Sequence, residues 1–574
     1  MPSAFDPELV RTLRRLKGDE TVRVLITFAD TVRVPRFPRL DAARARSEAH
    51  NKSALDSTNR LIRSLRTQRS RQYSADTTAL KSHGARIIKT FWIVQACAAE
   101  MRADSLRAMR VRGTNIVQVR LDRGQVAPDH DDERGNDMDA AVAQIGSNPW
   151  FTDFGDGLVA LLDTGVRSTH RLLNDPSPLC MLADLVSGAG TPLAGTVCSE
   201  AGADGSVPGA GDTYPDGHGT STATVLSGNG VPMTPEESSR GWFRGVTRAS
   251  LDCFQVYGAD HHLSAAAAVT GFELALARLD QVLVAEMQEN DVPDVGAIEA
   301  AADHAHDAGL VVIAAGGNDS LKGLGVPARA RRAIGVGAYG VQLNPPGYAY
   351  AWGPSPDGRP KPDLLAPTGT ETSGNKSDDS MRYHTATSGA TPYAAGAALL
   401  LENWLMRPWP STPFDPDPGQ VHALLILSGE AVGPFGSKTQ TGVGRLRMPE
   451  GGRMLCGKVS VSKGTRSVDV PIDLPEGGAD AISAAIWWPE RAVTINGVPQ
   501  DTHNDVDLEI RTPGLLGRRL AVSDGADGVF ERASFSDSDA LKQRLVLRIV
   551  PYKIRTAESQ VVYWALHAHG ATVK

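Results

Sequence analysis

The sequence predicts an α/β protein with a mainly parallel sheet, preceded by a small α+β domain and followed by an all-β sandwich. Over residues 141–455, apolar runs such as GLVALLDTG, QVLVAEM, GLVVIAAGGN and AIGVGAYG alternate with helix-favouring segments. Continuous apolar runs are typical of strands that are buried on both faces, as in a parallel sheet covered by helices. In residues 456–574 the helical patterns stop, and short strands separated by turn signals follow, which is typical of an antiparallel sandwich.

The N-terminal region, residues 1–123, has a pattern of its own. The segment VRVLITFAD alternates apolar and polar residues, which indicates a half-buried strand. A polar helical stretch, one or two strands over residues 85–101, a short helix and the strand NIVQVRLD follow it. Strands and helices in one small unit predict an α+β domain. Residues 124–140 carry several charges and almost no large apolar residue, and they predict an exposed linker.

Two other stretches carry expectations about surface and loops. Residues 171–216 are rich in Gly, Pro, Ser and Asp and predict a long irregular insertion. The helical stretch near residues 40–82 is arginine-rich, and its arginines form either a nucleic-acid patch or a solvated helix face. The acidic chain favours the solvated face. The arginines are Arg60, Arg63, Arg66, Arg69 and Arg71.

Composition narrows the possible functions. The 574 residues include 59 Lys and Arg against 66 Asp and Glu, a net charge of −7, which argues against a nucleic-acid binder. Five cysteines without a CxxC pair indicate neither a disulfide scaffold nor a zinc site. No apolar run is long enough to span a membrane, and the first residues lack the apolar core of a signal peptide. We therefore expect a cytoplasmic protein without a membrane partner, while export through a signal further upstream stays open.

Four segments of the α/β region carry residue types that could catalyse a reaction. Asp163 ends a predicted strand in LLDTGV, where active sites of open α/β sheets gather. His218 lies between two glycines in DGHGTSTA, and Asn318 follows a buried strand in VVIAAGGNDS. Ser388 precedes a long apolar helix in TATSGATPYAAG. Taken singly, each has an ordinary explanation as a turn, loop, positive-φ or helix-capping residue.

Together, in the order Asp, His, Asn, Ser, these segments resemble the Asp-Thr-Gly, His-Gly-Thr, Ala-Ala-Gly-Asn and Gly-Thr-Ser segments of the subtilisin-like serine proteases, the subtilases. The resemblance covers residues 141–455 and implies a subtilisin-like fold. Further positions that match the family are His170, the stretch Gly353–Gly369, Pro392 and Gly396.

The resemblance implies a serine endopeptidase that hydrolyses polypeptides through an acyl-enzyme. Ser388 would be the nucleophile, His218 its base and Asp163 the residue that orients the imidazole. Asn318 and the Ser388 backbone N–H would stabilise the oxyanion. No cofactor is required and no metal site is predicted. Calcium is conceivable at Asp505 and Asp507 or at Asp537 and Asp539, although solvated carboxylates are favoured there. The alternative function is a catalytically silent protein-binding module with the same fold.

The sequence departs from the family pattern around the nucleophile and the substrate strand. Ala386 stands where the family has Gly, and Gly389 where it has Met. The strand that usually reads Asn-Met-Ser-Leu-Gly is VAEMQEN here, which brings Glu286 near the specificity pocket. Glu286 either pairs with an Arg or Lys of the substrate or points to solvent. We expect Glu286, Gly316 and Gly317 to be substrate-binding residues.

The flanking regions resemble other parts of subtilases. Residues 1–123 resemble the inhibitory prodomain of the family, with NIVQVRLD or the residues just after it lying in the active site. The protein would then be made as an autoinhibited proenzyme, with its own prodomain as an intramolecular partner. The C-terminal region resembles the β-sandwich appended to many bacterial subtilases.

Overall fold

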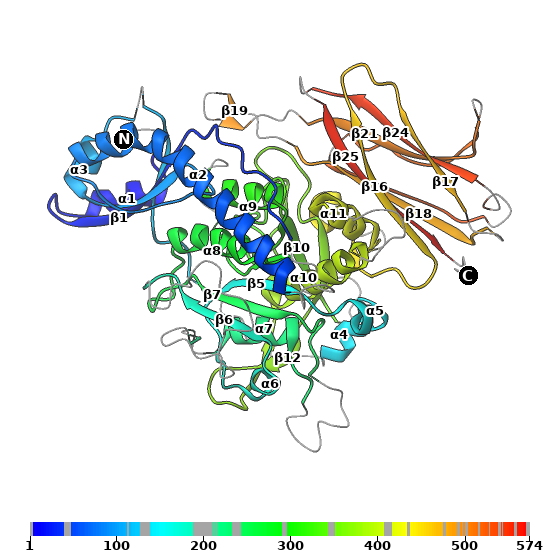
Figure 1. Ribbon diagram of the computed structural model, residues 1–574, viewed down its shortest axis with the longest axis horizontal. Coiled ribbons are helices and arrows are strands. Elements are labelled where there is room, and N and C mark those ends of the chain that lie inside the picture. Colours follow the sequence, from blue (N-terminus) through cyan, green and yellow to red (C-terminus); the bar gives the residue numbers. More distant parts are fainter. Residues whose placement is uncertain are drawn as a thin grey trace.

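The structure is a computed structural model of the whole chain. It describes residues 4–39, 48–111, 114–126, 138–187, 211–212, 214, 216–231, 243–289, 296–341, 350–406, 416–432, 437–474, 478–490, 494–495, 498–499, 503–514, 517–526, 528–537, 541, 544–555 and 559–569. Along the chain these residues form three successive domains. In Figure 1 the N-terminal domain (blue) and the C-terminal sandwich (orange to red) lie at opposite sides of the upper part of the central α/β domain.

The N-terminal domain is an antiparallel sheet with strand order β2-β3-β1-β4 and helices packed against it. Apolar residues alternate along β1, so that Val24 and Ile26 face a core of the domain's own while Leu25 faces the α/β domain. Its elements are α1 (Pro7–Arg15), β1 (Thr21–Phe28), α2 (Glu48–Ser82), β2 (Arg86–Thr90), β3 (Ala96–Arg102), α3 (Ala103–Ala108) and β4 (Ile116–Leu121). These elements agree with the α+β pattern of the sequence.

The central domain contains a sheet with the strand order β14-β15-β11-β10-β9-β8-β5-β7-β6. All neighbours from β15 to β6 are parallel, and β14 pairs antiparallel with β15. The strands are β5 (Leu158–Asp163), β6 (Leu179–Asp184), β7 (Ser250–Gln255), β8 (Val282–Ala285), β9 (Val311–Ala315), β10 (Ile334–Gly340), β11 (Leu364–Thr368), β14 (Gly429–Glu430) and β15 (Arg445–Leu446), beside a hairpin of β12 (Thr370–Ser373) and β13 (Met381–His384). The helices are α4 (Met138–Gln144), α5 (Asn148–Phe154), α6 (Arg171–Asn174), α7 (His218–Ser227), α8 (Ala265–Arg278), α9 (Ala297–Ala308), α10 (Ala386–Leu405), α11 (Pro418–Leu427) and α12 (Lys438–Thr441).

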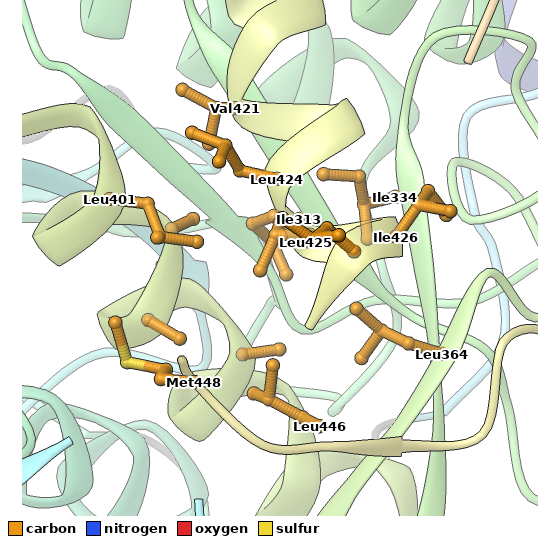
Figure 2. Packing of buried hydrophobic residues seen from close by; sticks show 14 of the residues in the cluster. Ile313, Ile334, Leu364, Leu401, Val421, Leu424, Leu425, Ile426, Leu446 and Met448 are labelled. Atoms are coloured by element: carbon orange, nitrogen blue, oxygen red, sulfur yellow. The ribbon is translucent and has the colours of Figure 1, made fainter. Parts of the chain in front are cut away.

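Helices cover both faces of this sheet, which explains the continuous apolar strands. Val282 and Val284 of β8 belong to the cluster on the α10 face, whereas Leu283 and Ala285 belong to the cluster that contains α8 and α9. Figure 2 shows part of the first cluster, where Leu401 of α10 and Leu424 of α11 gather with Ile313 of β9. These two hydrophobic clusters hold the helices against the two faces of the sheet.

The C-terminal domain consists of two antiparallel sheets, with strand orders β16-β25-β18-β23 and β17-β24-β21-β22. Its strands are β16 (Arg453–Val461), β17 (Val468–Asp473), β18 (Ala481–Trp487), β19 (Thr494–Ile495), β20 (Val498–Pro499), β21 (Asp505–Arg511), β22 (Arg519–Ser523), β23 (Phe530–Phe535), β24 (Arg544–Lys553) and β25 (Gln560–His569). The sandwich therefore begins at Arg453, slightly before the expected residue 456.

Two expectations about surface and loops need correction. Within residues 171–216, α6 and β6 are regular elements, and β6 is the edge strand of the main sheet. Four of the five arginines expected on a solvated helix face are exposed, namely Arg60, Arg63, Arg66 and Arg71. Arg69 is the exception: it is 1% exposed, forms an ion pair with Asp30 at 2.8 Å, and donates to the Trp92 carbonyl at 2.6 Å. Most of the expected linker 124–140 lies outside the described residues. No helix among the described residues is long and apolar enough to cross a membrane.

Candidate active site

The order of the strands directs attention to the end of β5. After β5 the chain forms β6 and then β7 on one side of β5, and afterwards β8 and β9 on the other side. The strand order therefore reverses at β5. Ligands of open α/β sheets bind at such switch points, outside the carboxyl ends of the strands. Asp163 is the last residue of β5 and is 1% exposed. The topology thus gives this carboxyl a position typical of a functional site.

His218 begins α7 and contacts Asp163 directly. Its Nδ1 lies 2.7 Å from Asp163 Oδ1. Gly217, with φ +86°, lets the chain turn sharply into the helix. A Cβ on Gly219 would lie 2.1 Å from the Gly165 carbonyl oxygen, so only glycine permits this approach of helix and strand. The two glycines around the histidine therefore bring the imidazole against the carboxyl.

The second oxygen of Asp163 is also bound. Thr222, one helical turn after His218, donates its hydroxyl to Asp163 Oδ2 at 2.9 Å. His384 lies on the other side of Thr222, with 3.1 Å between its Nε2 and the Thr222 Oγ1, and its ring meets the His218 ring edge-on at 5.1 Å. Burial, and then the proximity of His218, lower the pKa of His384 well below its ordinary value, so this second imidazole stays neutral.

Ser388 lies in the first turn of α10 and is 4% exposed. The preceding turn is unusual because Ala386, where subtilases have Gly, has φ +58°. Gly389 is required, since a Cβ there would lie 2.4 Å from both the His384 carbonyl oxygen and Thr368 Oγ1. His218 Nε2 is buried and has no hydrogen-bond partner among the described residues. The base thus keeps a free nitrogen in the interior of the site.

Asn318, three residues after β9, is fixed by the residue before the serine. Its Oδ1 accepts hydrogen bonds from the Thr387 backbone N–H at 3.1 Å and from the Thr387 hydroxyl at 2.7 Å. Both donors point at the same oxygen, so the amide nitrogen Nδ2 is directed away from them. An amide held in this way next to the serine can donate to a developing oxyanion.

Gly316 and Gly317 connect β9 to Asn318, and their peptide groups already have partners. The Gly316 N–H donates to the Val336 carbonyl at 2.9 Å, and the Gly317 carbonyl accepts from the Ala351 N–H at 2.7 Å. Gly317 has φ +107°, and a Cβ there would lie 2.3 Å from Gln288 Oε1. If these glycines bind substrate, as expected from the sequence, they would do so by leaving room for it, because the peptide groups named above already have hydrogen-bond partners.

Glu286 does not point to solvent, and its pairing with a substrate Arg or Lys stays a prediction. Its side chain is 1% exposed, so it does not point to solvent. Neither carboxyl oxygen has a hydrogen-bond partner among the described residues. Burial and the nearby Asp163 charge raise the pKa of Glu286 well above its ordinary value, while the facing Ser388 hydroxyl opposes that rise. A neutral buried acid is a poor partner for a substrate Arg or Lys.

Two residues support the site without having been singled out for it from the sequence. Asp212 accepts from the Thr164 hydroxyl at 2.8 Å and from the Thr220 N–H at 2.9 Å, and so joins the end of β5 to the start of α7. Burial raises the pKa of Asp212 to about 6, against the hydrogen bonds from Thr220. His170, noted for its family match, caps α6 through its Nδ1 and has its Nε2 2.9 Å from the Ser380 carbonyl.

The described residues contain no cluster of three or more His, Cys, Asp or Glu that could hold a metal ion. Asp505 and Asp507 lie on β21, where burial and then the Asp505 charge raise the pKa of Asp507 to about 6. Asp537 is described, whereas Asp539 lies outside the described residues. Calcium binding at these positions stays untested.

Comparison with known proteins agrees with this geometry. Residues 156–444 match the subtilase family, Peptidase S8. The match spans half of the chain and contains Asp163, His218, Asn318 and Ser388. The chain belongs to the subtilase family and is a subtilisin-like serine peptidase.

Among solved structures, one similar protein is the epidermin leader peptide processing serine protease EpiP from Staphylococcus aureus. The two chains are 15% identical with a TM-score of 0.48, and the match covers 75% of this chain and 97% of the other.

Proposed function

We propose that this serine peptidase is an endopeptidase that uses Ser388, His218 and Asp163 as a catalytic triad. The observation that carries the proposal is the 2.7 Å contact between His218 Nδ1 and Asp163 Oδ1 at the switch point of the sheet, with the start of α10 beside it. The free Nε2 of His218 supports the same assignment, because that nitrogen must accept the nucleophile's proton.

The mechanism follows from these roles. Ser388 Oγ attacks the peptide carbonyl carbon while its proton passes to His218 Nε2, and the new C–O bond leaves an oxyanion. Asp163 stabilises the imidazolium and fixes its tautomer, and Thr222 holds the carboxylate from the far side. Asn318 Nδ2 and the Ser388 N–H donate to the oxyanion. The oxyanion then collapses, the C–N bond breaks and the imidazolium protonates the leaving amine. Water attacks the acyl-enzyme with His218 again as base, and the C–O bond to Ser388 breaks as the serine regains its proton.

Removing the nucleophile tests the proposal most directly. Ser388→Ala should abolish peptide hydrolysis and labelling by a fluorophosphonate probe, with unchanged folding by circular dichroism. Asn318→Ala should lower kcat by about a hundred- to thousand-fold, the loss that subtilisin itself shows when an oxyanion donor is removed. Wild-type turnover by Ser388→Ala would refute the triad. Absence of both hydrolysis and labelling in the wild-type protein after removal of residues 1–126 would favour the silent binding module.

We further propose that residues 1–123 act as an inhibitory prodomain. The residues just after β4 support this proposal, because the Gly124 N–H donates to the Leu263 carbonyl at 2.6 Å and the Leu263 N–H donates to the Gln125 carbonyl at 3.1 Å. Val126 forms an antiparallel bridge with His262. This extended pairing lies next to His261, whose ring contacts Tyr214, which in turn contacts His218. An extended substrate would bind such an edge in the same way.

Tethering explains how this segment could hold the enzyme inactive. A flexible link keeps the segment at an effective concentration of about millimolar, so even a weak inhibitor stays bound. Cleavage after residue 126 would end the tethering. Mass spectrometry should find the wild-type chain shortened and Ser388→Ala at full length, and a fragment of residues 1–125 should inhibit the processed enzyme in trans. A full-length, fully active wild type that the fragment does not inhibit would instead indicate a permanent docking domain.

The compartment remains a prediction, and Cys180 weighs against the cytoplasm. Cys180 is disulfide-bonded, whereas Cys97, Cys253 and Cys456 are free. Disulfides persist mainly in oxidising compartments. Thiol alkylation of the protein from its native host, with and without reduction, would show whether the bond forms there.

A further inference from the structure

Glu286 lies at the edge of the sheet that carries the candidate site, because of the register between two strands. Leu162 of β5 pairs with Ala285 of β8, so the next residues, Asp163 and Glu286, are neighbours at the carboxyl edge of the sheet. Side chains alternate along a strand, and Val282 and Val284 face the α10 side. Glu286 therefore points to the same side as Asp163, toward the start of α10, and the Ser388 hydroxyl is the polar group that faces its carboxyl.

The surroundings of Glu286 contain unused hydrogen-bonding atoms. Both oxygens of Glu286 and His218 Nε2 are buried and lack hydrogen-bond partners among the described residues. The backbone of Glu286 is fixed, because its N–H donates to the Leu162 carbonyl at 3.0 Å and its carbonyl accepts from the Tyr257 hydroxyl at 3.2 Å. The site thus contains two kinds of buried acceptor without a partner among the described residues, the His218 imidazole and the Glu286 carboxyl.

The titratable groups at this part of the site come from several elements. Asp163 of β5 and Tyr257 after β7 act on or contact Glu286, and His218 of α7 and His384 before α10 lie next to each other in the same site. Asp163 is the charge that acts on Glu286, and it repels a second negative charge. Burial raises the pKa of Tyr257 well above its ordinary value, and burial lowers the pKa of His384, so both stay neutral.

We propose that Glu286 is a positioning residue for the nucleophile of the proposed triad, with opposite effects in its two protonation states. As a neutral acid it leaves the Ser388 O–H free to donate to His218 Nε2. As a carboxylate it accepts the Ser388 O–H itself, because a hydrogen bond to an ionised oxygen is stronger than one to a neutral imidazole. The serine is then turned away from its base. The switch costs one proton, which Glu286 gives to solvent, and no bond of Ser388 breaks.

The proposal rests on the proposed triad and predicts an alkaline limb in the pH dependence of kcat/KM. At alkaline pH, kcat/KM falls as Glu286 loses its proton and its carboxylate takes the Ser388 hydroxyl. The carboxyl keeps its proton above the ordinary Glu pKa in the folded protein but not in the unfolded chain. Stability should therefore decline as pH rises from the ordinary Glu pKa to the raised one.

The decisive variant is Glu286→Gln, which keeps the shape and cannot ionise. At acid pH it should match wild-type kcat/KM within about threefold. Two pH units above the wild-type alkaline midpoint, the wild type should have lost about a hundredfold and the variant almost nothing, since one ionisation changes activity about tenfold per pH unit. Its stability should also be less sensitive to pH. An alkaline limb identical in the two proteins overturns the proposal.

Asp280→Asn is the matched control. Asp280 lies near the opposite end of β8, is 6% exposed, and its two carboxyl oxygens also lack hydrogen-bond partners among the described residues. Burial raises the pKa of Asp280 well above its ordinary value as well. This variant should change the pH dependence of stability and leave the alkaline limb of kcat/KM in place. If Asp280→Asn also lost the alkaline limb, the limb would reflect the pH dependence of stability, and the positioning role of Glu286 would be refuted.

A second measurement keeps the test valid if Glu286→Gln does not fold. The rate at which a fluorophosphonate labels wild-type Ser388 should rise and then fall with pH, and a plateau at alkaline pH overturns the proposal. If Ser388→Ala remains active, the triad itself is wrong; if Ser388→Ala is inactive and the alkaline limb is absent, only the role of Glu286 fails. A changed preference for Arg or Lys before the scissile bond in Glu286→Gln supports the substrate pocket and overturns the positioning role.

Discussion

The N-terminal domain and the C-terminal sandwich are both packed on the peptidase domain, and they differ in how their cores are arranged. The N-terminal domain keeps a cluster of its own, which includes Phe5, Leu9, Val24 and Ile26. The other face of its sheet belongs, together with Phe37 and with Ile62 and Leu65 of α2, to the cluster that contains α8 and α9. At the edges of that contact the partners are polar, as in the ion pair between Arg120 and Glu289.

The sandwich has no separate cluster among the described residues. Its inner residues continue directly into the cluster that contains α10 and α11. Trp487 is fully buried, and its ring stacks on His422 of α11 with 4.0 Å between centroids and 16° between planes. Gly419 permits a similarly close approach, since a Cβ there would lie 2.2 Å from the Tyr563 ring.

The difference indicates which neighbour can leave. A domain with its own core keeps its fold after separation, and its polar edge groups regain water. A domain that shares its core exposes a large apolar surface when removed, which is unfavourable in water. We therefore expect the N-terminal domain to be separable from the enzyme and the sandwich to be a permanent part of it.

Trp487→Ala should have the largest effect on stability. It removes a fully buried indole from the shared core, and such changes destabilise by about 3–5 kcal/mol. Urea unfolding in the Ser388→Ala background, which prevents self-cleavage, measures the loss. Trp487→Phe, which keeps an aromatic ring against His422, should lose clearly less. A midpoint shift no larger than that of a surface substitution would mean that the sandwich is not part of the core.

Trp92→Ala is the equivalent change at the N-terminal contact. Trp92 is 4% exposed, stacks on Phe37 at 5.6 Å and belongs to the cluster shared with α8 and α9. The fragment of residues 1–125 should inhibit at least about thirtyfold more weakly with this change, the ~2 kcal/mol of an interface hot spot. The processed enzyme lacks Trp92, so its stability stays the same. Equal inhibition by the two fragments would contradict a separable inhibitor.

Glu273→Gln should weaken the same contact less. The Glu273 carboxyl accepts hydrogen bonds from the N–H groups of Trp92 and Ile93, the second at 3.2 Å, and the amide keeps its shape. A hydrogen bond to a charged acceptor exceeds a neutral one by about 1 kcal/mol, which corresponds to roughly fivefold in the inhibition constant. Titration of the variant enzyme with the wild-type fragment checks this. A loss that exceeds that of Trp92→Ala would reverse the ranking of the apolar and polar contributions.

Part of the fold could be predicted from the sequence because strands buried on both faces leave long apolar runs. The strands β5, β8, β9 and β10 were identified from such runs. Strand β6 was not, because an edge strand needs only a short apolar segment and Gly- and Pro-containing sequence surrounds it. The burial of Arg69 could not be predicted either, since its partners Asp30 and Trp92 are brought to it by the tertiary fold.

In the candidate site, too, some residues could be predicted from the sequence and others could not. Asp163, His218, Asn318 and Ser388 could be identified because each lies in a short local motif. The part played by Thr222 had an available signal, its spacing of four residues from His218 on one helix face. The orientation of Glu286 follows from the alternation of side chains along β8 in the structure. It could not be predicted, because VLVAEM is apolar on both faces and does not indicate which face lies on the side of the site. Asp212 and His384 reach the site only through the fold.

Ala386→Gly should have the smallest effect, and it lies in the peptidase domain that both neighbours share. Ala386 has φ +58°, a conformation that costs a residue with a Cβ about 1 kcal/mol and glycine almost nothing. Glycine loses more conformational freedom on folding, so the net gain should be below about 1 kcal/mol. Because this turn is held within the domain, by the Thr368 hydroxyl on the Ala386 carbonyl at 2.7 Å, the gain should be equal in the full chain and in the processed enzyme. Urea midpoints of both forms, each in the Ser388→Ala background with the processed form made by expression from residue 138, measure it. A gain confined to the full chain would mean that the N-terminal domain strains the nucleophile turn. The N-terminal domain and the sandwich would then differ in their effect on the site as well as in whether they can be separated from the enzyme.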